Sequence, residues 1–365
     1  MLAFVLPIII LLVVGILDKI VRMNHFQKII AYFLTLIPFV ALQGSRDITV
    51  GADTSMYWIL FENTRLLSWS YLFKNFPMVK IHDLHFGQPI ETGYVILNKF
   101  VSLFTDNPQV MLYVCAALIC IGFYIFICSN CHSIFWGTLV FFCDGLYMNS
   151  FNTMRQVLAI AIAINAFTAF KKGKKSITIL LIFLGYTIHS TSMIVVLLLI
   201  LYYFFTHVPK KWEKYFYLLA IFLPLIIEQV TFILPGYTGY TNNKLYDFSL
   251  NGTLILWGAY IFFIVLLEYK SEMNTDLKYY LLMFSLFVVM QIMAQNITGM
   301  SRLSLWFEPF TILLIDMVNQ DYNVRYPYIF GRKSIVKLSS KYLIAILLVA
   351  MYISYAKTLS MYIIS

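Results

Sequence analysis

The stretch LAFVLPIIILLVVGIL, residues 2–17, decides the class of fold. It carries no charged, amide or hydroxyl side chain, and Asp18 and Lys19 follow only at its end. A helix that spans a membrane needs about 20 mostly apolar residues. Neither a basic leader nor a small-residue cleavage site accompanies the run, so we expect a retained first spanning helix with its N-terminus outside.

Similar apolar runs follow along the rest of the chain. Of the 365 residues, 61% are hydrophobic and 12% are charged, whereas soluble domains are about half apolar and about a quarter charged. We predict an all-α, polytopic integral membrane helical bundle that forms a single domain over residues 1–365. The runs indicate about twelve transmembrane helices, near residues 1–17, 29–43, 110–128, 134–148, 155–170, 176–189, 191–205, 216–235, 252–268, 278–294, 303–318 and 342–361.

Short basic loops between these runs set the predicted orientation. They are DKIVRMNHFQK (18–28), KKGKK (171–175), VPKKWEK (208–214) and FGRKSIVK (330–337), the last within a predicted cytoplasmic loop over 319–341. The positive-inside rule places all of them in the cytoplasm and accounts for the net charge of +9 without a nucleic-acid partner. The main extracytoplasmic segment is then 44–109, with an amphipathic helix near 90–105 on the outer surface.

Polar residues concentrate on the predicted outer side. They lie in GSRDITVGADTSMYW (44–58), MNSFNTMRQ (148–156), IHSTS (188–192), the loop 236–252 and QNITGMSR (295–302). Arg46, Arg155 and Arg302 stand at or near outer helix ends, where the positive-inside rule gives no reason for them. We therefore predict a site at the outer membrane–water boundary that binds an anionic group.

The second and third of these stretches supply further candidates. Asn149, Asn152 and Gln156 share one side of a helix, with Arg155 at its margin. These residues can bind the headgroup of a lipid-linked ligand. Alternatively, they can form the end of a membrane helix whose side chains reach the phosphates of the surrounding bilayer, and composition favours neither role. His189 at a hairpin tip is a candidate general base; the alternative is an interfacial histidine that bonds a nearby carbonyl.

The first stretch contains more polar residues than a connector needs. Asp53 is placed to cap a helix that begins at Thr54, and Tyr57 follows one turn later. Capping does not account for Arg46 and Asp47, which we count with Tyr57 as candidate substrate-binding residues. Asp53 is also an alternative base. Cys128 and Cys131 form one pair of possible zinc ligands. The sequence shows no second pair, so we expect no metal site and no cofactor.

Three of the stretches carry a resemblance to a known family. RDITVGADTSMYW (46–58), NTMRQVLAIAI (152–162) and IHSTS (188–192) resemble the EpsG-like exopolysaccharide polymerases, a branch of the Wzy-type polymerases of bacterial surface polysaccharides. The resemblance implies a polytopic glycosyltransferase at the outer face of the bacterial plasma (inner) membrane. Its implied substrate is an oligosaccharide linked to a polyprenyl pyrophosphate such as undecaprenyl pyrophosphate.

The expected reaction transfers a growing glycan from its lipid pyrophosphate to a single lipid-linked repeat unit. Arg155 and Arg302, with Arg46 as a third, would bind the leaving pyrophosphate, and His189 or Asp53 would accept the hydroxyl proton. Arginines can neutralise the pyrophosphate, so a metal-independent enzyme is expected. The product can be O-antigen of lipopolysaccharide, capsule or exopolysaccharide, with a chain-length regulator as a further partner. A flippase or exporter of the same lipid and a membrane O-acyltransferase are the alternatives.

Overall fold

The computed structural model describes residues 2–81, 89–207, 275–294, 298–321 and 335–361. The predicted spans near 216–235 and 252–268 lie outside the described residues, as do the loops 208–214 and 236–252 and most of the loop 319–341. The chain forms two compact units, one of Met1–Val195 with Val318–Ser365 and one of Val196–Met317. The single membrane domain stays a prediction.

In its described residues, the first unit is a helical bundle with one very short sheet. Its helices are α1 Leu2–Val21, α2 His25–Leu34, α3 Leu36–Gly44, α4 Thr54–Leu66, α5 Trp69–Lys74, α6 Thr92–Val101, α7 Pro108–Asn130, α8 Ile134–Cys143, α9 Leu146–Asn149, α10 Met154–Ala163, α11 Asn165–Lys171, α12 Lys175–Ile188, the 3-10 helix η1 Ser190–Met193 and α19 Ile335–Met361. The strands β1 Met78–Val79 and β2 Ile90–Glu91 pair antiparallel, with Met78 opposite Glu91.

The second unit contains most of α13 (Ile194–His207) together with α16 (Thr275–Met293), α17 (Thr298–Ser304) and most of α18 (Pro309–Asp321). The predicted span near 303–318 is divided here between α17 and α18. Proline at the first position of α18 suits a helix start, because its missing N–H would have no partner there. Tyr279 donates from its hydroxyl to the Leu198 carbonyl at 2.8 Å, which joins α16 to α13.

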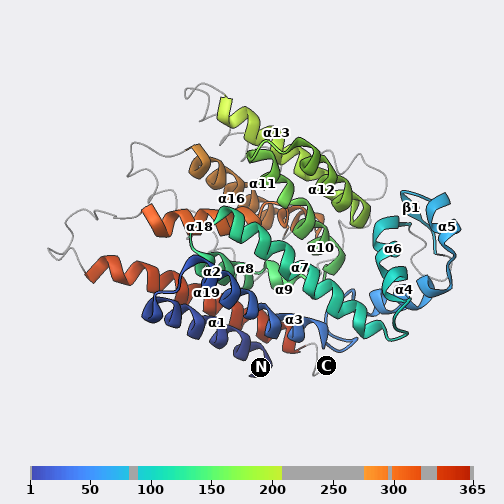
Figure 1. Ribbon diagram of the computed structural model, residues 1–365, viewed down its shortest axis with the longest axis horizontal. Coiled ribbons are helices and arrows are strands. Elements are labelled where there is room, and N and C mark those ends of the chain that lie inside the picture. Colours follow the sequence, from blue (N-terminus) through green and yellow to red (C-terminus); the bar gives the residue numbers. More distant parts are fainter. Residues whose placement is uncertain (1, 82–88, 208–274, 295–297, 322–334, 362–365) are drawn as a thin grey trace. The chain divides into compact units, whose positions relative to one another are not determined.

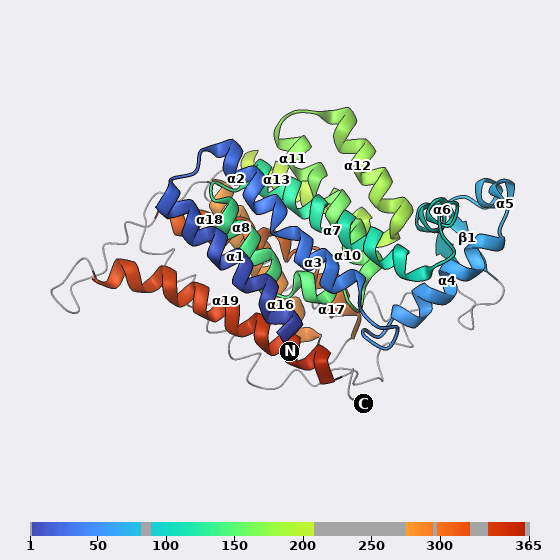
Figure 2. The same ribbon diagram turned by 60° about the horizontal axis from the view of Figure 1, so that its bottom comes forward.

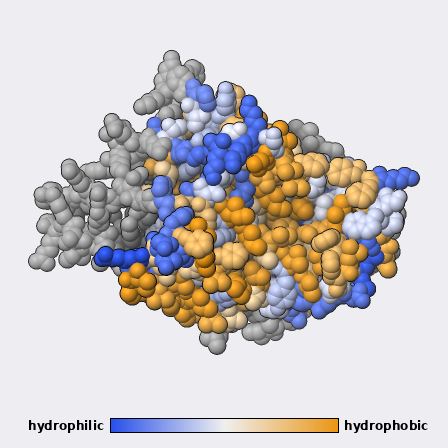
Figure 3. All heavy atoms as spheres, in the orientation of Figure 1, coloured by the Kyte–Doolittle hydropathy of each residue, from blue (hydrophilic) through white to orange (hydrophobic). Residues whose placement is uncertain are grey.

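The prediction of an all-α, multi-pass membrane protein is confirmed. Within the described residues, five helices are long and apolar enough to cross a membrane: Ala3–Val21, His25–Gly44, Pro108–Asn130, Met154–Lys171 and Ser190–His207. On α1 the buried side chains Phe4, Ile8 and Leu11 recur every three to four residues, while Leu6 and Ile9 on the other face are exposed. Figure 3 shows such apolar surface over much of one face. The total of about twelve spans stays a prediction.

Helix α7 organises the first unit. It packs against α3 and α10, and α10 packs in turn against α12, as both views of the ribbon show (Figures 1 and 2). The predicted span near 134–148 is shorter than expected. Helix α8 ends at Cys143, where the Asp144 carboxylate accepts the Leu146 N–H at 3.1 Å and Gly145 takes a φ of 117°.

The first unit has two chemically different ends. At one end, α7 begins beside the 44–58 stretch, and Gln109 Nε2 donates to the Arg46 carbonyl at 3.1 Å. At the other end, Asn130 Nδ2 donates to Thr168 Oγ1 at 2.6 Å, close to the basic loop 171–175. The 23 residues of α7 separate these ends by about 35 Å. We call them the site end and the basic end.

The segment 44–109 forms a small subassembly at the site end. Helices α4, α5 and α6 lie beyond the ends of α10 and α12 in Figures 1 and 2. The predicted helix near 90–105 is present as α6, which packs against α4 and α12. Its buried side chains include Tyr94, Val95 and Asn98. One face of α6 is therefore part of the protein interior, and its position relative to a membrane stays a prediction.

Candidate functional site

The stretches 44–58 and 148–156, which are predicted to lie on the same side, meet at the site end. Asn152 Oδ1 accepts the backbone N–H of Ala52 at 3.0 Å. Gly51 has a φ of 93°, and a Cβ there would overlap the Phe151 carbonyl. The close approach of these two stretches therefore depends on glycine at position 51.

Arg46 lies inside this contact and is only 5% exposed. Its Nε donates to Thr54 Oγ1 at 3.2 Å and its Nη1 to the Gln43 carbonyl at 3.3 Å. The guanidinium also lies 5.4 Å from the centre of the Phe151 ring. Burial lowers the pKa of Arg46. These contacts hold the 44–58 stretch in place, and a substrate-binding role for Arg46 stays a prediction.

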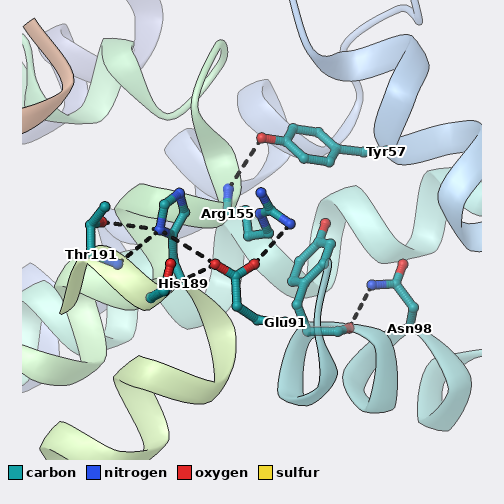
Figure 4. A network of polar contacts seen from close by, with 8 residues as sticks. Tyr57, Glu91, Asn98, Arg155, His189 and Thr191 are labelled. Atoms are coloured by element: carbon teal, nitrogen blue, oxygen red, sulfur yellow. Dashed lines mark hydrogen bonds and ion pairs between the residues drawn. The ribbon is translucent and has the colours of Figure 1, made fainter. Parts of the chain in front are cut away.

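Glu91 joins three segments that are far apart in the sequence (Figure 4). Its Oε2 lies 3.0 Å from Nη1 of Arg155. Its Oε1 accepts the Ser190 N–H at 2.8 Å and lies 3.8 Å from Nδ1 of His189. The Glu91 side chain is 6% exposed, so this carboxylate contacts protein on almost every side. We call Glu91, Arg155 and His189 the Glu91 cluster.

Local packing explains why Glu91 lies there. It is the last residue of β2, opposite Met78, and it occupies the N-cap position of α6. Two residues later, Gly93 packs against Thr187 so closely that a Cβ would overlap the threonine. Because position 93 has no side chain, the start of α6 comes against the end of α12. Glu91 is thereby placed beside the backbone of Ser190.

The surroundings of Glu91 keep its carboxylate ionised. Burial on its own raises the pKa of Glu91, because it removes water from the charged form. The charges of Arg155 and His189 and the N–H of Ser190 act in the opposite direction and prevail, so the pKa lies below its ordinary value. At neutral pH the site end therefore holds a buried carboxylate paired with an arginine.

Arg155 is fixed at several points while its guanidinium stays partly accessible. Its backbone N–H donates to the Tyr57 hydroxyl at 3.4 Å, and its guanidinium lies 6.0 Å from the centre of the Tyr94 ring. Tyr57 and Tyr94 are both buried and meet edge to face. The Arg155 side chain is 20% exposed, against 6% for Glu91. One side of this arginine is thus anchored by protein and the other can face a ligand.

His189 presents its Nδ1 to Glu91 and to Thr191. The Thr191 N–H lies 3.3 Å and the Thr191 hydroxyl 3.0 Å from this nitrogen. When Nδ1 accepts the N–H, the neutral ring carries its proton on Nε2. When Nδ1–H instead donates to the hydroxyl, Nε2 has the lone pair that a base needs. The alternative prediction for His189 was an interfacial histidine that bonds a backbone carbonyl. The contacts described at its Nδ1 are instead the Glu91 carboxylate, the Thr191 hydroxyl and the Thr191 N–H.

The prediction for Asp53 is half right. Helix α4 begins at Thr54 and Asp53 is its N-cap residue, but the Asp53 side chain makes no capping hydrogen bond. Its φ of −102° and ψ of 1° lie outside the extended region in which a cap carboxylate reaches the first turn. Capping by Asp53 was therefore a wrong prediction, and its role as an alternative base stays a prediction.

The remaining predicted residues are not part of the Glu91 cluster. Asp47 is exposed, and its Oδ1 accepts the Thr49 N–H at 2.9 Å and the Thr49 hydroxyl at 2.8 Å, two bonds that lower the pKa of Asp47. Gln156 is buried. Arg302 is exposed on α17 in the second unit. Substrate binding by these three residues stays a prediction.

Glu91 was absent from the sequence-based set of candidates. It stands in PIETGY (89–94), where it has the sequence context of an ordinary helix cap. The available signal was electrostatic, because Glu91 is an acidic residue in the same predicted outer segment as Arg46. Its partners could not be read from spacing, since they come from α10 and from the end of α12.

Comparison with known proteins decides the family. The model of the EpsG family matches residues 28–365, which include every residue of the Glu91 cluster. The chain belongs to the EpsG family. This confirms the family predicted from the three stretches, and the EpsG-family protein is a multi-pass membrane protein of polysaccharide biosynthesis. Searches among curated proteins and among solved structures found no match.

Proposed function

We propose that this EpsG-family protein polymerises polyprenyl-pyrophosphate-linked oligosaccharide repeat units at the outer face of the bacterial plasma membrane. The growing glycan on its lipid pyrophosphate is the donor, and a single lipid-linked repeat unit is the acceptor. The acceptor hydroxyl oxygen forms a bond to the anomeric carbon of the donor. The bond from that carbon to the pyrophosphate oxygen breaks, and polyprenyl pyrophosphate leaves with the bonding electrons.

The observation that carries this proposal is the Glu91 cluster itself. It combines a partly exposed arginine with a histidine, and the same buried carboxylate contacts both. An arginine can bind a pyrophosphate through two parallel hydrogen bonds, and a histidine can accept the proton of a sugar hydroxyl. The cluster stands at a helix end, where a lipid-linked pyrophosphate would lie at the boundary of a membrane.

Arg155 is proposed to bind the pyrophosphate as it leaves. Negative charge grows on the leaving group in the transition state, so a cation fixed in advance lowers the barrier more than it stabilises the bound substrate. The ion pair with Glu91 and the ring of Tyr94 fix the guanidinium before the substrate arrives. The partial exposure of Arg155 supports a role toward a ligand.

His189 is proposed as the base, with Asp53 as the alternative. The base role requires the tautomer in which Nδ1–H donates to the Thr191 hydroxyl, because Nε2 must accept the proton of the acceptor hydroxyl. Glu91, 3.8 Å from Nδ1, favours a proton on that nitrogen and stabilises the imidazolium that forms. Glu91 acts through its neighbours and is a positioning residue.

Metal independence is part of the proposal, with arginine side chains supplying the positive charge that a pyrophosphate needs. The sugars, the linkage and a chain-length regulator are not specified by the residues of the Glu91 cluster.

Deletion of the gene tests the function. A polymerase mutant is expected to lose the glycan ladder, retain a single repeat and accumulate lipid-linked single repeats at the outer face. An exporter mutant would hold the same lipid at the inner face, and an acyltransferase mutant would keep a ladder of normal length without acyl groups. Either of these two outcomes would contradict the proposal.

A further inference from the structure

A recess opens at the basic end of the first unit, far from the Glu91 cluster. It has a volume of about 400 Å³ and lies where α1 ends and where α2 and α8 begin. Its lining includes two contrasting groups of residues. Lys19, Arg22 and Lys28 are cationic, whereas Gly15, Phe135 and Trp136 are small or aromatic.

The cationic lining carries more positive charge than its acid balances. Asp18 is the acidic residue among the lining side chains, and its Oδ1 lies 3.2 Å from Nζ of Lys28. Its Oδ2 accepts the Tyr32 hydroxyl at 3.1 Å. Asp18 is thus engaged by Lys28 and Tyr32, and the charges of Lys19 and Arg22 remain in excess at the rim. The positive-inside rule accounts for basic residues in this loop, but it does not require that they line one recess.

The apolar lining lies deeper along α1. Gly15 precedes Lys19 by one helical turn and Arg22 by two, which corresponds to about 6 and 10 Å along the helix axis. The Phe135 ring packs on Gly15 so closely that a Cβ at position 15 would overlap it. The recess therefore has a cationic rim at the helix ends, and the ring of Phe135 lies one to two turns farther along α1, an amphipathic arrangement like that of a lipid.

The backbone at Arg22 is a second, independent observation. Arg22 has a φ of 52°, in the left-handed region, and it follows the last residue of α1. Glycine is the usual residue at such a position because a Cβ is strained there. An arginine at this strained position is explained if its guanidinium makes a contact that glycine, which has no side chain, could not make.

We propose that this recess binds the phosphate headgroup of an anionic membrane lipid. Lys19 and Arg22 contact the phosphate, and an acyl chain lies along Phe135 and Trp136. Arginine and lysine at a membrane boundary are the residue types that bind lipid phosphates. The site is separate from the proposed pyrophosphate site at the opposite end of the unit.

A charge-matched pair of variants tests this proposal in the full-length protein in detergent. The test variant is Lys19→Gln/Arg22→Gly, in which glycine suits the positive φ and preserves the backbone. The control variant is Lys172→Gln/Lys174→Gln, which removes the same charge from the exposed loop at the same end, where no atom comes within 4 Å of a Cβ built on Gly173. The measurement is the rise in Tm when phosphatidylglycerol, phosphatidylcholine or inorganic phosphate is added, each at the same molar concentration of phosphorus.

We expect the Tm of the wild type and of the control variant to rise with phosphatidylglycerol and to change little with the other two additives. The test variant is expected to start at a Tm no lower than that of the wild type and to lose most of the rise. Lys19→Gln alone, which leaves the backbone unchanged, should lose part of it. Equal losses in test and control variants, or a full rise in the test variant, would overturn the proposal. An equal rise with inorganic phosphate would overturn the assignment to a lipid.

Discussion

Arg155 and Glu91, on α10 and at the start of α6, form a 3.0 Å ion pair in which the glutamate is almost completely buried and the arginine is partly exposed. This asymmetry distinguishes the pair from the exposed ion pair of Arg65 with Asp106, in which both side chains are accessible. A buried carboxylate that loses its partner is costly, so the two groups are held together. The pair gives the site end a fixed cation.

Glu91→Gln tests the positioning role of this carboxylate. Glutamine keeps the size of the side chain and removes its charge, so Arg155 and His189 lose the group that orients them. A misplacement of about 1 Å can cost about a hundredfold in rate, and we expect a loss of that order in the rate of polymer formation. The matched control is Glu62→Gln on the exposed face of α4, which should leave the rate unchanged. A normal rate for Glu91→Gln would exclude the positioning role.

The pH dependence of stability reports on the same carboxylate. The pKa of Glu91 is depressed in the folded protein, so its ionised form contributes stability above the ordinary pKa of about 4.3. That contribution disappears as the pH falls through the lower folded-state value. We expect the Tm of the wild type to drop more steeply than that of Glu91→Gln below about pH 4.3. Parallel curves for the two proteins would show that Glu91 is not coupled to folding.

His189 and Asp53 can be separated by paired substitutions. A base typically contributes about a hundredfold or more to rate, so His189→Ala is expected to reduce polymerisation by at least that factor while the protein stays folded in the membrane. Asp53→Asn keeps the size of the side chain and should have a small effect, because His189 is the proposed base. If polymerisation is lost with Asp53→Asn and kept with His189→Ala, Asp53 is the base and His189 is not.

The predicted orientation is testable with single cysteines. Glu62 near the site end and Lys172 at the basic end are both exposed. In cells whose protein lacks the native cysteines, a membrane-impermeant thiol reagent is expected to label Glu62→Cys and not Lys172→Cys. The reverse labelling pattern would place the Glu91 cluster at the cytoplasmic face.

The sequence predicted the class of fold, and it predicted that the polar stretches share one side, both for physical reasons. Apolar length and basic loops predict which helix ends share a side, and the contact of Ala52 with Asn152 is compatible with that prediction. The pairing of Glu91 with Arg155 did not follow, because it depends on the pairing of β2 with β1 and on the approach of Gly93 to Thr187. Both are contacts between segments that no local pattern links.

The most direct test of the central claim is an assay with purified protein and a single lipid-linked repeat unit as both donor and acceptor. The account predicts that wild type and Arg65→Lys form polymer and release polyprenyl pyrophosphate at similar rates. Arg155→Lys should be slower by about a hundredfold, because an ammonium cannot reproduce the planar pair of donors that binds two phosphate oxygens. Polymer formation at the wild-type rate by Arg155→Lys, or no polymer from the wild type, would contradict the account.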